Sequence, residues 1–489
     1  MSGDMPSVCV IGAGSSGITA CKNFKQRGIP FECIESSDCI GGMWVLNNAV
    51  AFNGKSSAYQ SLHINTSRRQ MAYADFPMPA NYPDFPSHEQ IVKYLNDYVD
   101  HFDLRTHIRF NTTVTHCRRL DNGVWEVTFD NGETREYDAL VVANGHHWDP
   151  CWPEPRFPGV FNGVEMHAHD YLSPTQPHDL RGKNVVIVGM GNSAMDIASE
   201  LGRGENAHRV FLSARTGTYI LPKYLFHKLP MDRLARHPSQ TPGLLERISH
   251  LIPARFKDTL SQPLMTFGLN LLVGRPEHYG LPAPKGWFGQ QHPTISSEIH
   301  IRLGSGDVTP KPNIQELQGD TVSFVDGTQE RADAIIYCTG YKISFPFFDS
   351  DLIPSHDNDI ALYMRMMDPC YDNLFFLGLV QPLCAMMPIA DEQSKWMAAY
   401  LAGEYHTPPP EVMRQRMVDE HEATKRRYIK SRRHTIQINC QEYTYSLWRD
   451  LNEGRKRAAL ADHRLPVVNR TRNSITHTPE APVLGKRVS

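Results

Sequence analysis

Short apolar runs followed by glycine-rich loops and helical segments give the chain its clearest pattern. Residues 7–11 read Ser-Val-Cys-Val-Ile, and the loop 12–17 follows at once as Gly-Ala-Gly-Ser-Ser-Gly. The stretch 18–27 has helical character, and a second apolar run at 31–34 leads directly to Glu35. A strand, a glycine loop, a helix and a second strand in this order predict a βαβ unit.

The same pattern returns near the middle of the chain. An apolar run at 184–188 meets the loop 189–194, which reads Gly-Met-Gly-Asn-Ser-Ala. A helical stretch continues to Leu201, and a further apolar run at 209–213 ends two residues before Arg215. The chain therefore contains two units with a loop of the dinucleotide-binding type.

A second repetition supports this division into two similar halves. The run 125–129 and an Asp-Asn-Gly turn lead to the buried-type segment 138–145, which ends on glycine. The run 321–325 and an Asp-Gly turn lead in the same way to 333–340. Each half therefore includes a β-meander that runs into a buried strand.

These repeats predict an α/β protein with two nested Rossmann-like dinucleotide-binding domains, the second inserted into the first. We expect the first domain to comprise residues 1–160 and 325–455. The second domain is expected at 161–324, with an aperiodic insertion rich in proline, histidine and aromatic residues at about 216–292. The polar stretch 456–489 is expected to form a C-terminal arm.

The first loop has the residues that binding of a dinucleotide requires. Gly12 permits a tight strand-to-helix turn, Gly14 lets the backbone approach a pyrophosphate, and Gly17 allows close packing of helix and strand. The helix N-terminus offers free N–H groups to the phosphates, and Ser16 belongs to the same loop. Glu35, at the end of the second strand, is placed to bind ribose hydroxyls. We therefore expect FAD at this loop.

The second loop favours NADPH. Ala194 is an accepted small residue at the position where the helix packs on the strand. The next strand ends near Arg215 and not near a carboxylate, which would repel a 2′-phosphate. A guanidinium pairs with that phosphate bidentately, although Arg215 as an ordinary surface residue is the alternative. The expected NADPH contacts are Gly189, Gly191, Asn192, Ser193, Ser213, Arg215 and Thr216.

Composition narrows the class of protein. The chain has 489 residues, a formal net charge of -3 and 40% hydrophobic residues, which is typical of a globular protein and argues against a nucleic-acid partner. The sequence shows no secretory signal pattern and no apolar stretch of the roughly 20 residues that span a bilayer. We therefore expect a cytoplasmic protein without a membrane span.

The ten cysteines are scattered, with no CxxC pair and no zinc-type spacing. We expect them to be reduced thiols, and we expect no metal site. A redox-active pair of Cys33 and Cys39 is the less favoured alternative, because the region before Gly41 does not resemble a disulfide-reductase loop.

The segment 161–171 carries a specific resemblance. Its Phe, Gly, His and Tyr residues match the pattern FxGxxxHxxx(Y/F), which is the fingerprint of the flavin-containing monooxygenases. Further segments look like motifs of that family, and together they extend from about residue 7 to about residue 450. They are Gly41-Gly42-Met43-Trp44, Asn65-Thr66-Ser67, Phe76-Pro77-Met78-Pro79, Cys338-Thr339-Gly340-Tyr341 and Gly378-Leu379-Val380-Gln381-Pro382.

The resemblance implies an enzyme that contains FAD and uses NADPH and O2. In this family the reduced flavin captures O2 as a C4a-(hydro)peroxyflavin, which bound NADP+ stabilises until an amine nitrogen or sulfide sulfur takes the distal oxygen. Asn65 is expected to lie over the flavin as the catalytic residue; an Asx-type turn is the alternative. The other cofactor contacts implied are Gly42, Trp44, His63, Thr339, Gly340 and Gln381, where core packing for Trp44 and strand capping for Gln381 are alternatives.

Two other functions stay open at this point. Baeyer–Villiger monooxygenases, which act on ketones, are similar, but they usually have Trp where this chain has Tyr171. An NADPH oxidase that releases hydrogen peroxide would need the same cofactors. His167 is expected to have a structural part at the domain junction. The polar C-terminal stretch leads us to expect no hydrophobic anchor of the kind that animal members carry, and the sequence resembles a soluble microbial type. A homodimer is compatible with the sequence, which specifies neither oligomeric state nor substrate.

Overall fold

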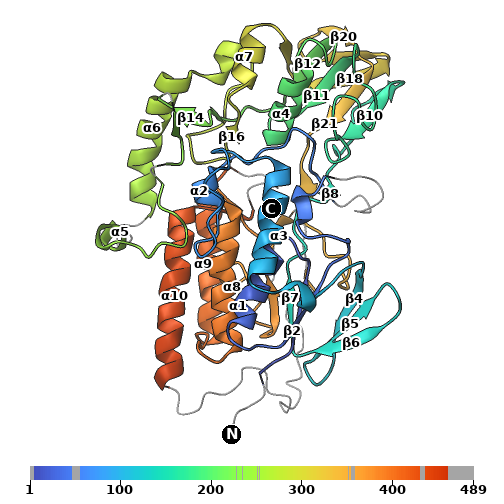
Figure 1. Cartoon of the computed structure of the whole chain (residues 1–489). Helices are drawn as coiled ribbons and strands as arrows, with labels where there is room; N and C mark the ends of the chain where they lie inside the picture. Colours follow the sequence, from blue (N-terminus) through green and yellow to red (C-terminus); the bar gives the residue numbers. More distant parts are fainter. Residues whose placement is uncertain are drawn as a thin grey trace, which may run out of the picture.

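The computed structural model describes residues 5–46, 56–226, 228–233, 235–249, 252, 254–350, 352–353, 358–429 and 435–460. Two five-stranded sheets, each entirely parallel, form the centres of two domains (Figure 1). The fold expected from the repeats, two nested Rossmann-like domains, is confirmed.

The first sheet has the strand order β23-β7-β1-β2-β3. Helix α1 (Ser15–Lys25) follows β1 directly and packs on α8 (Met386–Leu401), where Lys22 and Asp391 form a buried ion pair at 3.0 Å. This pair fixes the position of the helix that follows the first glycine loop. The strands are β1 (Val8–Ile11), β2 (Phe31–Ile34), β3 (Ile108–Arg109), β7 (Ala139–Val142) and β23 (Leu374–Phe376).

The second sheet has the order β10-β21-β11-β12-β17, and helix α4 (Asn192–Leu201) follows β11 as α1 follows β1. Its strands are β10 (Val164–His167), β11 (Asn184–Val188), β12 (Arg209–Ser213), β17 (Val308–Lys311) and β21 (Ala334–Tyr337).

Both faces of each sheet are covered, which explains the continuous apolar runs. In β1, Val8 and Val10 belong to the core under α1 and α8, whereas Cys9 and Ile11 pack with Trp125 of the opposite layer. All four residues of β1 are buried. Parallel sheets covered in this way leave the carboxyl ends of the strands as the place for ligands.

A β-meander forms the outer layer of each domain. The first has the order β4-β5-β6, and the second has the order β20-β19-β18 with β9 added in parallel to β18. The strands are β4 (Val114–Arg119), β5 (Trp125–Phe129), β6 (Thr134–Tyr137), β9 (Gly159–Phe161), β18 (Ile314–Gly319), β19 (Thr321–Phe324) and β20 (Gln329–Arg331).

The expected boundary at residue 324 between the second domain and the rest of the first is wrong. β21 pairs with β11 in the register Val185↔Ala334, so the chain stays in the second domain through Tyr337. The strand that returns to the first sheet is β23. The reason is the internal repeat: each meander leads into a strand of its own sheet, β6 into β7 and β20 into β21.

The two chain segments that connect the domains lie next to each other. Strand β8 (Asp149–Pro150) pairs with β22 (Tyr341–Lys342), and the Cys151 amide donates to the Gly340 carbonyl oxygen at 2.9 Å. The inserted domain therefore begins and ends at one short ladder.

The insertion expected at 216–292 is closed at its base by the pairing of β13 with β16, in the register Ile220↔Thr294. Its longest element is α6, which lies on the left side of the view in Figure 1, above α5. The elements here are β13 (Ile220–Leu221), β14 (Tyr224–Leu225), β15 (Leu229–Pro230), α5 (Leu244–Ser249), α6 (Ala254–Val273), η3 (Pro276–Tyr279), β16 (Thr294–Ile295) and α7 (Ile299–Gly304).

The first domain is completed by helices along the chain's later part. α10 continues to Leu460, so it includes the start of the arm expected at 456–489, and residues 461–489 lie outside the described residues. The remaining elements are η1 (Gly42–Trp44), α2 (Arg68–Met71), α3 (His88–His101), η2 (Arg105–His107), β24 (Gln381–Pro382), α9 (Pro410–Arg427), β25 (Gln437–Ile438) and α10 (Cys440–Leu460). Across the described ranges, no helix is long and apolar enough to cross a membrane.

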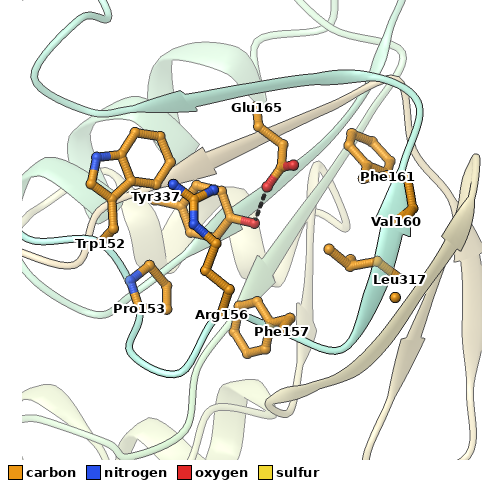
Figure 2. A pocket seen from close by; sticks show the side chains of 10 residues that line it. Trp152, Pro153, Arg156, Phe157, Val160, Phe161, Glu165, Leu317 and Tyr337 are labelled. Atoms are coloured by element: carbon orange, nitrogen blue, oxygen red, sulfur yellow. Dashed lines mark hydrogen bonds between the residues drawn. The ribbon is translucent and has the colours of Figure 1, made fainter.

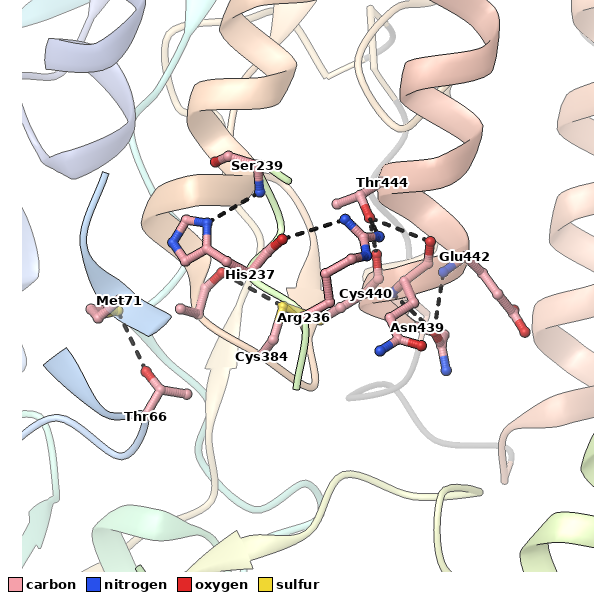
Figure 3. Close-up of a disulfide and its surroundings, with 12 residues drawn as sticks. Thr66, Met71, Arg236, His237, Ser239, Cys384, Asn439, Cys440, Glu442 and Thr444 are labelled. Carbon is pink, nitrogen blue, oxygen red and sulfur yellow. Dashed lines mark hydrogen bonds between the residues drawn. A yellow bond between two sulfur atoms is a disulfide. The ribbon is translucent and has the colours of Figure 1, made fainter. Parts of the chain in front are cut away.

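The expectation of reduced cysteines is wrong for one pair. Cys384, in the loop between β24 and α8, forms a disulfide with Cys440 at the start of α10 (Figure 3). The pairing of β24 with β25 brings these two segments together, with Gln381 opposite Gln437. Cys33 and Cys39 are both free.

Candidate active site

The two glycine loops share one geometric requirement. Gly12 has φ +103°, and a Cβ there would lie 2.7 Å from the carbonyl oxygen of Ala143. Gly189 has φ +137°, and a Cβ there would lie 2.5 Å from the carbonyl oxygen of Cys338. Each loop therefore needs glycine because the residue after the neighbouring strand, β7 or β21, passes against it. The backbone cradles for two nucleotides are both present.

Glu35 is buried at the end of β2 and bonds to the first loop. Its Oε2 accepts from the Ala13 amide at 2.7 Å, and its Oε1 accepts from the Ser37 amide and hydroxyl at 2.9 and 2.8 Å. The carboxylate thus links the glycine loop to the segment after β2. Ribose binding by Glu35 stays a prediction.

The Gly41–Trp44 segment lies against the first loop. A Cβ on Gly42 would come within 3.1 Å of the Gly14 Cα, so these two glycines let the segments touch. Ser16 lies beside Gly378, whose Cβ would meet the Ser16 hydroxyl oxygen at 2.5 Å. Trp44 is only 9% exposed and packs in the core; a contact with the flavin stays a prediction. The structure therefore brings Gly42, Ser16 and Gly378 together at the first loop.

Asn65 presents a buried polar atom without a partner. Its Oδ1 is shielded from solvent and accepts no hydrogen bond from the described residues. An Asx turn would use that oxygen, so the alternative interpretation finds no support. The backbone is held from two sides, because the Ile64 amide donates to Pro86 O at 3.1 Å and Lys223 Nζ donates to Ile64 O at 3.0 Å. A buried amide oxygen of this kind fits a hydrogen-bond donor on a cofactor.

Charged groups surround this point at the domain junction. Tyr59 donates from its hydroxyl to Asp196 Oδ2 at 2.5 Å, and Asp196 lies on α4 of the second domain. Desolvation raises the pKa of the Asp196 carboxyl to about 6, and the Tyr59 hydrogen bond and the Lys223 charge oppose the increase. Burial lowers the pKa of Lys223, although Asp196 counteracts it. His63 is exposed, with Nδ1 2.8 Å from Ser61 O.

The second loop is braced by the strand that closes the insertion. Asn192 Oδ1 accepts from the Ile295 amide at 2.9 Å, and the Thr294 hydroxyl donates to Met190 O at 2.6 Å. Ser213 is fully buried, its hydroxyl donates to Pro312 O at 2.8 Å, and its carbonyl oxygen accepts from the Gly189 amide at 2.9 Å, so it lies against the second loop; nucleotide binding by Ser213 stays a prediction. Sequence reasoning missed Thr294, because the contact spans the whole insertion.

Arg215 and Thr216 are exposed just after β12. Within the described part of the chain no carboxylate pairs with Arg215, so its guanidinium is free for an anion. This position, beside the carboxyl end of β12, suits a ribose 2′-phosphate. Ser193 lies in the first turn of α4, half-buried.

The fingerprint residues have structural roles. A Cβ on Gly163 would lie 2.4 Å from Asp333 O, so glycine is needed where β10 approaches β21. His167 is 1% exposed, its Nδ1 accepts from the His169 amide at 3.1 Å, and burial lowers its pKa to about 4. Tyr171 is buried and donates to Glu200 Oε2 at 3.0 Å. His167 is therefore a neutral residue at the domain junction, as expected.

The other expected contacts lie at two places. Gly340 has φ +87°, and the Thr339 hydroxyl donates to Cys151 O at 2.5 Å, so both belong to the crossover beside the second loop. Gln381 is half-buried, and its backbone N–H donates to Ile436 O at 2.8 Å in the first domain. Asn144 and Gly145, at the first loop, are the counterparts of Thr339 and Gly340. Sequence reasoning did not select them, although the repeated strand endings could have indicated them.

An aromatic pocket of about 210 Å³ has no residue of either glycine loop in its lining (Figure 2). Tyr337 donates to Glu165 Oε2 at 2.5 Å, and the guanidinium of Arg156 lies 4.8 Å from the centre of the Trp152 ring. The chain's own arginine thus already takes the place that a cation would occupy. Among the described residues no group of three or more His, Cys, Asp or Glu side chains could hold a metal ion.

Comparison with known proteins agrees with this geometry. The family described as Flavin-binding monooxygenase-like matches residues 6–455. Flavin-containing monooxygenase 5 of Mus musculus is 34% identical over 442 residues, covering 88% of this chain and 80% of that protein. Dimethylaniline monooxygenase [N-oxide-forming] 2 of Mus musculus is 32% identical over 448 residues, covering 89% and 81%.

Among solved structures, the OTEMO complex with FAD and NADP superposes with a TM-score of 0.68 at 20% identity, covering 93% of this chain and 99% of that one. The resemblance carried by the fingerprint is thereby confirmed. The chain belongs to the flavin-binding monooxygenase-like family and is an FAD-containing, NADPH-dependent monooxygenase.

Proposed function

We propose that the protein oxygenates soft nucleophiles, namely amine nitrogens and sulfide sulfurs. For a sulfide the balance is R–S–R′ + O2 + NADPH + H⁺ giving R–S(O)–R′ + NADP⁺ + H2O. Bound FAD, once reduced by NADPH, supplies the chemistry that activates O2. The printed name of the dimethylaniline relative, an N-oxide-forming enzyme, supports nitrogen as one acceptor.

The observation that carries the proposal is the unpartnered Oδ1 of Asn65. A neutral amide donates and accepts hydrogen bonds without titrating, so it can hold a reduced cofactor and a polar reaction product in the same pH range. The contacts to Ile64 fix the backbone before it, and this rigidity is what a group that orients a reaction needs. We propose Asn65 as the catalytic residue.

The remaining residues bind, orient and exclude water. Gly12, Gly14 and Gly17 with Glu35 would hold FAD, and Gly189, Gly191 and Arg215 would hold NADPH. His167, neutral at pH 7, and Tyr171 keep the junction between the two sites closed. Burial of these two side chains would help to exclude solvent from the sites.

The test is a product balance with three substrates. Purified holoenzyme is given NADPH with methyl phenyl sulfide, N,N-dimethylaniline or cyclohexanone, and NADPH, oxygenated product and hydrogen peroxide are quantified. We expect sulfoxide and N-oxide to form in proportion to NADPH. Faster lactone formation from cyclohexanone would show a Baeyer–Villiger enzyme, and peroxide equal to NADPH with every substrate would show an oxidase.

A cytoplasmic location and a homodimer stay predictions. Light scattering on the purified protein measures the assembly directly.

A further inference from the structure

A cavity of about 570 Å³ lies between the first domain and the inserted segment of the second. One wall is the stretch from Ser67 to Asp84, and the other is the stretch from Pro230 to Gln240. The walls are tied together, because the Ser67 amide donates to Asp232 Oδ2 at 2.6 Å and His237 Nε2 donates to Ala72 O at 3.1 Å. The hydrogen bond that fixes His237 to Ser239 is drawn in Figure 3. The volume of the cavity is that of a small-molecule binding site.

The cavity adjoins the elements proposed to hold the flavin. Ser67 stands two residues after Asn65 in the same segment. Tyr73, another lining residue, donates from its hydroxyl to Ser15 O at 2.5 Å, in the first turn of α1. A molecule in this cavity therefore lies against the same backbone that carries Asn65 and the first glycine loop.

The lining carries more positive than negative charge, with three arginines against the single carboxylate of Asp84. Arg68, Arg69 and Arg233 all line the cavity, and within the described residues none of them forms an ion pair with a carboxylate. Arg69 Nη1 donates to Arg233 O at 3.4 Å, which draws these two arginines together from opposite walls. Asp84 is the acidic residue of the lining, and its Oδ2 accepts from the Tyr224 hydroxyl at 3.1 Å.

Guanidinium groups that share a cavity repel one another unless an anion lies between them. Arginine presents a planar fork of donors that matches a carboxylate, and pairing of this kind is strongest in a partly enclosed place. Arg68 and Arg69 each donate one hydrogen bond to a backbone carbonyl oxygen, that of Pro79 at 2.9 Å and that of Arg233 at 3.4 Å. The neighbouring Arg236 pairs with Glu246 at 2.9 Å and is not part of the lining. The charge of the cavity thus selects the ligand's sign, and its volume limits the ligand's size.

We propose that this cavity binds the carboxylate of the substrate, so that the enzyme prefers thioethers and amines that carry a carboxylate over neutral ones of the same size. The preference rests on the proposed oxygenation of sulfur and nitrogen. Arg69 and Arg233 are the specificity-determining residues, and Arg68 supplies a third positive charge. The reaction balance is unchanged, because the carboxylate is bound and not transformed.

The experiment compares 3-(methylthio)propanoate with 3-(methylthio)propanamide, which has the same shape without the charge. We expect kcat/KM for the acid to exceed that for the amide by about tenfold to a hundredfold, the effect of a charge-assisted contact. In the Arg69→Gln/Arg233→Gln double variant this ratio should fall towards one. The Arg69→Lys/Arg233→Gln variant, which keeps one positive charge, should retain part of the preference for the acid. The ratio within one variant cancels any general loss of activity.

Arg181→Gln is the matched control, because Arg181 is exposed, pairs with Asp179 at 2.8 Å and does not line the cavity. Its ratio should equal that of the wild type. Titration calorimetry of the oxidised holoenzyme with the acid gives a second readout that needs no turnover. We expect binding that weakens at least tenfold in the double variant.

The outcomes separate this inference from the proposed function. Equal kcat/KM for acid and amide, or an acid preference that survives in the double variant, overturns the carboxylate site while oxygenation stands. Peroxide without sulfoxide from both compounds overturns the proposed function, and calorimetry then still decides whether the cavity binds the acid. Binding that is the same in wild type and double variant overturns the site in either case.

Discussion

Lys223 donates a hydrogen bond from its side-chain nitrogen to the carbonyl oxygen of Ile64 at 3.0 Å. Lys223 belongs to the inserted segment of the NADPH-binding domain, and Ile64 precedes the proposed catalytic Asn65 in the FAD-binding domain. The contact therefore makes the position of Asn65 depend on the domain that binds the reductant.

Replacing Lys223 should uncouple the enzyme. In Lys223→Met the Ile64 carbonyl loses its donor, and a shift of Asn65 by a fraction of an ångström is enough to slow oxygenation by about tenfold to a hundredfold. Hydrogen peroxide per NADPH should rise in proportion, and Lys223→Arg should restore coupling in part. Lys228→Gln, an exposed lysine of the same segment, is the control. A product yield per NADPH that stays at the wild-type value contradicts a positioning role.

Removing the amide of Asn65 should stop oxygenation but not reduction of the flavin. In Asn65→Ala we expect sulfoxide formation to fall by about a hundredfold or more, the usual effect of losing one oriented hydrogen-bonding group. Anaerobic bleaching of the flavin by NADPH should continue, because that step uses the glycine loops and Arg215. Coupled turnover at the wild-type rate in this variant would rule Asn65 out.

Arg215 should determine the choice of nicotinamide nucleotide. Its exposed guanidinium has no carboxylate partner among the described residues, so Arg215→Ala removes only the pairing with a 2′-phosphate. The ratio of kcat/KM for NADPH to that for NADH should fall by about tenfold to a hundredfold. The steady-state rate of nucleotide oxidation at saturating sulfide measures it. An unchanged ratio would leave Arg215 an ordinary surface residue.

The burial of His167 should appear in the pH dependence of stability. Its pKa is about 4 in the folded protein and 6.5 when exposed, so the unfolded chain binds more protons between these values. Acidification from pH 6.5 to 4 therefore costs the wild type up to about 3 kcal/mol through this residue. His167→Gln lacks this contribution, so the difference in Tm between wild type and variant should shrink as the pH falls. Parallel Tm curves would contradict a buried neutral His167.

The Cys384–Cys440 disulfide should stabilise the C-terminal helix region. It closes a loop across 56 residues, which corresponds to about 4 kcal/mol if the whole effect comes from the unfolded chain. Cys384→Ser should lower the free energy of unfolding by up to that amount in urea titrations. A reducing agent should do the same to the wild type and nothing further to the variant. Cys370→Ser, which replaces an exposed free thiol, controls for the loss of a sulfur.

Local sequence carried most of the fold because both glycine loops sit between a buried strand and a helix. The ends of the strands near Glu35 and Arg215 could also be located from the sequence, and so could the two meanders. These features, like the glycine loops, depend on residues that are neighbours in the chain. The boundary at 324 failed because a strand's sheet partner, here β21 with β11, is a long-range property.

The same reason explains what was missed in the site. The contact of Lys223 with Ile64 spans 159 residues, and that of Thr294 with Met190 spans 104. The segments around Lys223 and Thr294 contain no periodic pattern or motif from which these contacts could be predicted. The disulfide joins two cysteines that nothing in the sequence pairs.

The hydrogen bond between the Cys151 amide and the Gly340 carbonyl oxygen has a consequence for modularity. The inserted unit enters and leaves through adjacent residues of the β8–β22 ladder, so its removal would leave the host domain a gap that a short turn can bridge. The strand order of the host sheet contains no strand from the insert. The inserted domain is thus one continuous stretch of chain between the two strands of this ladder, and its core also packs Tyr59 of the host domain.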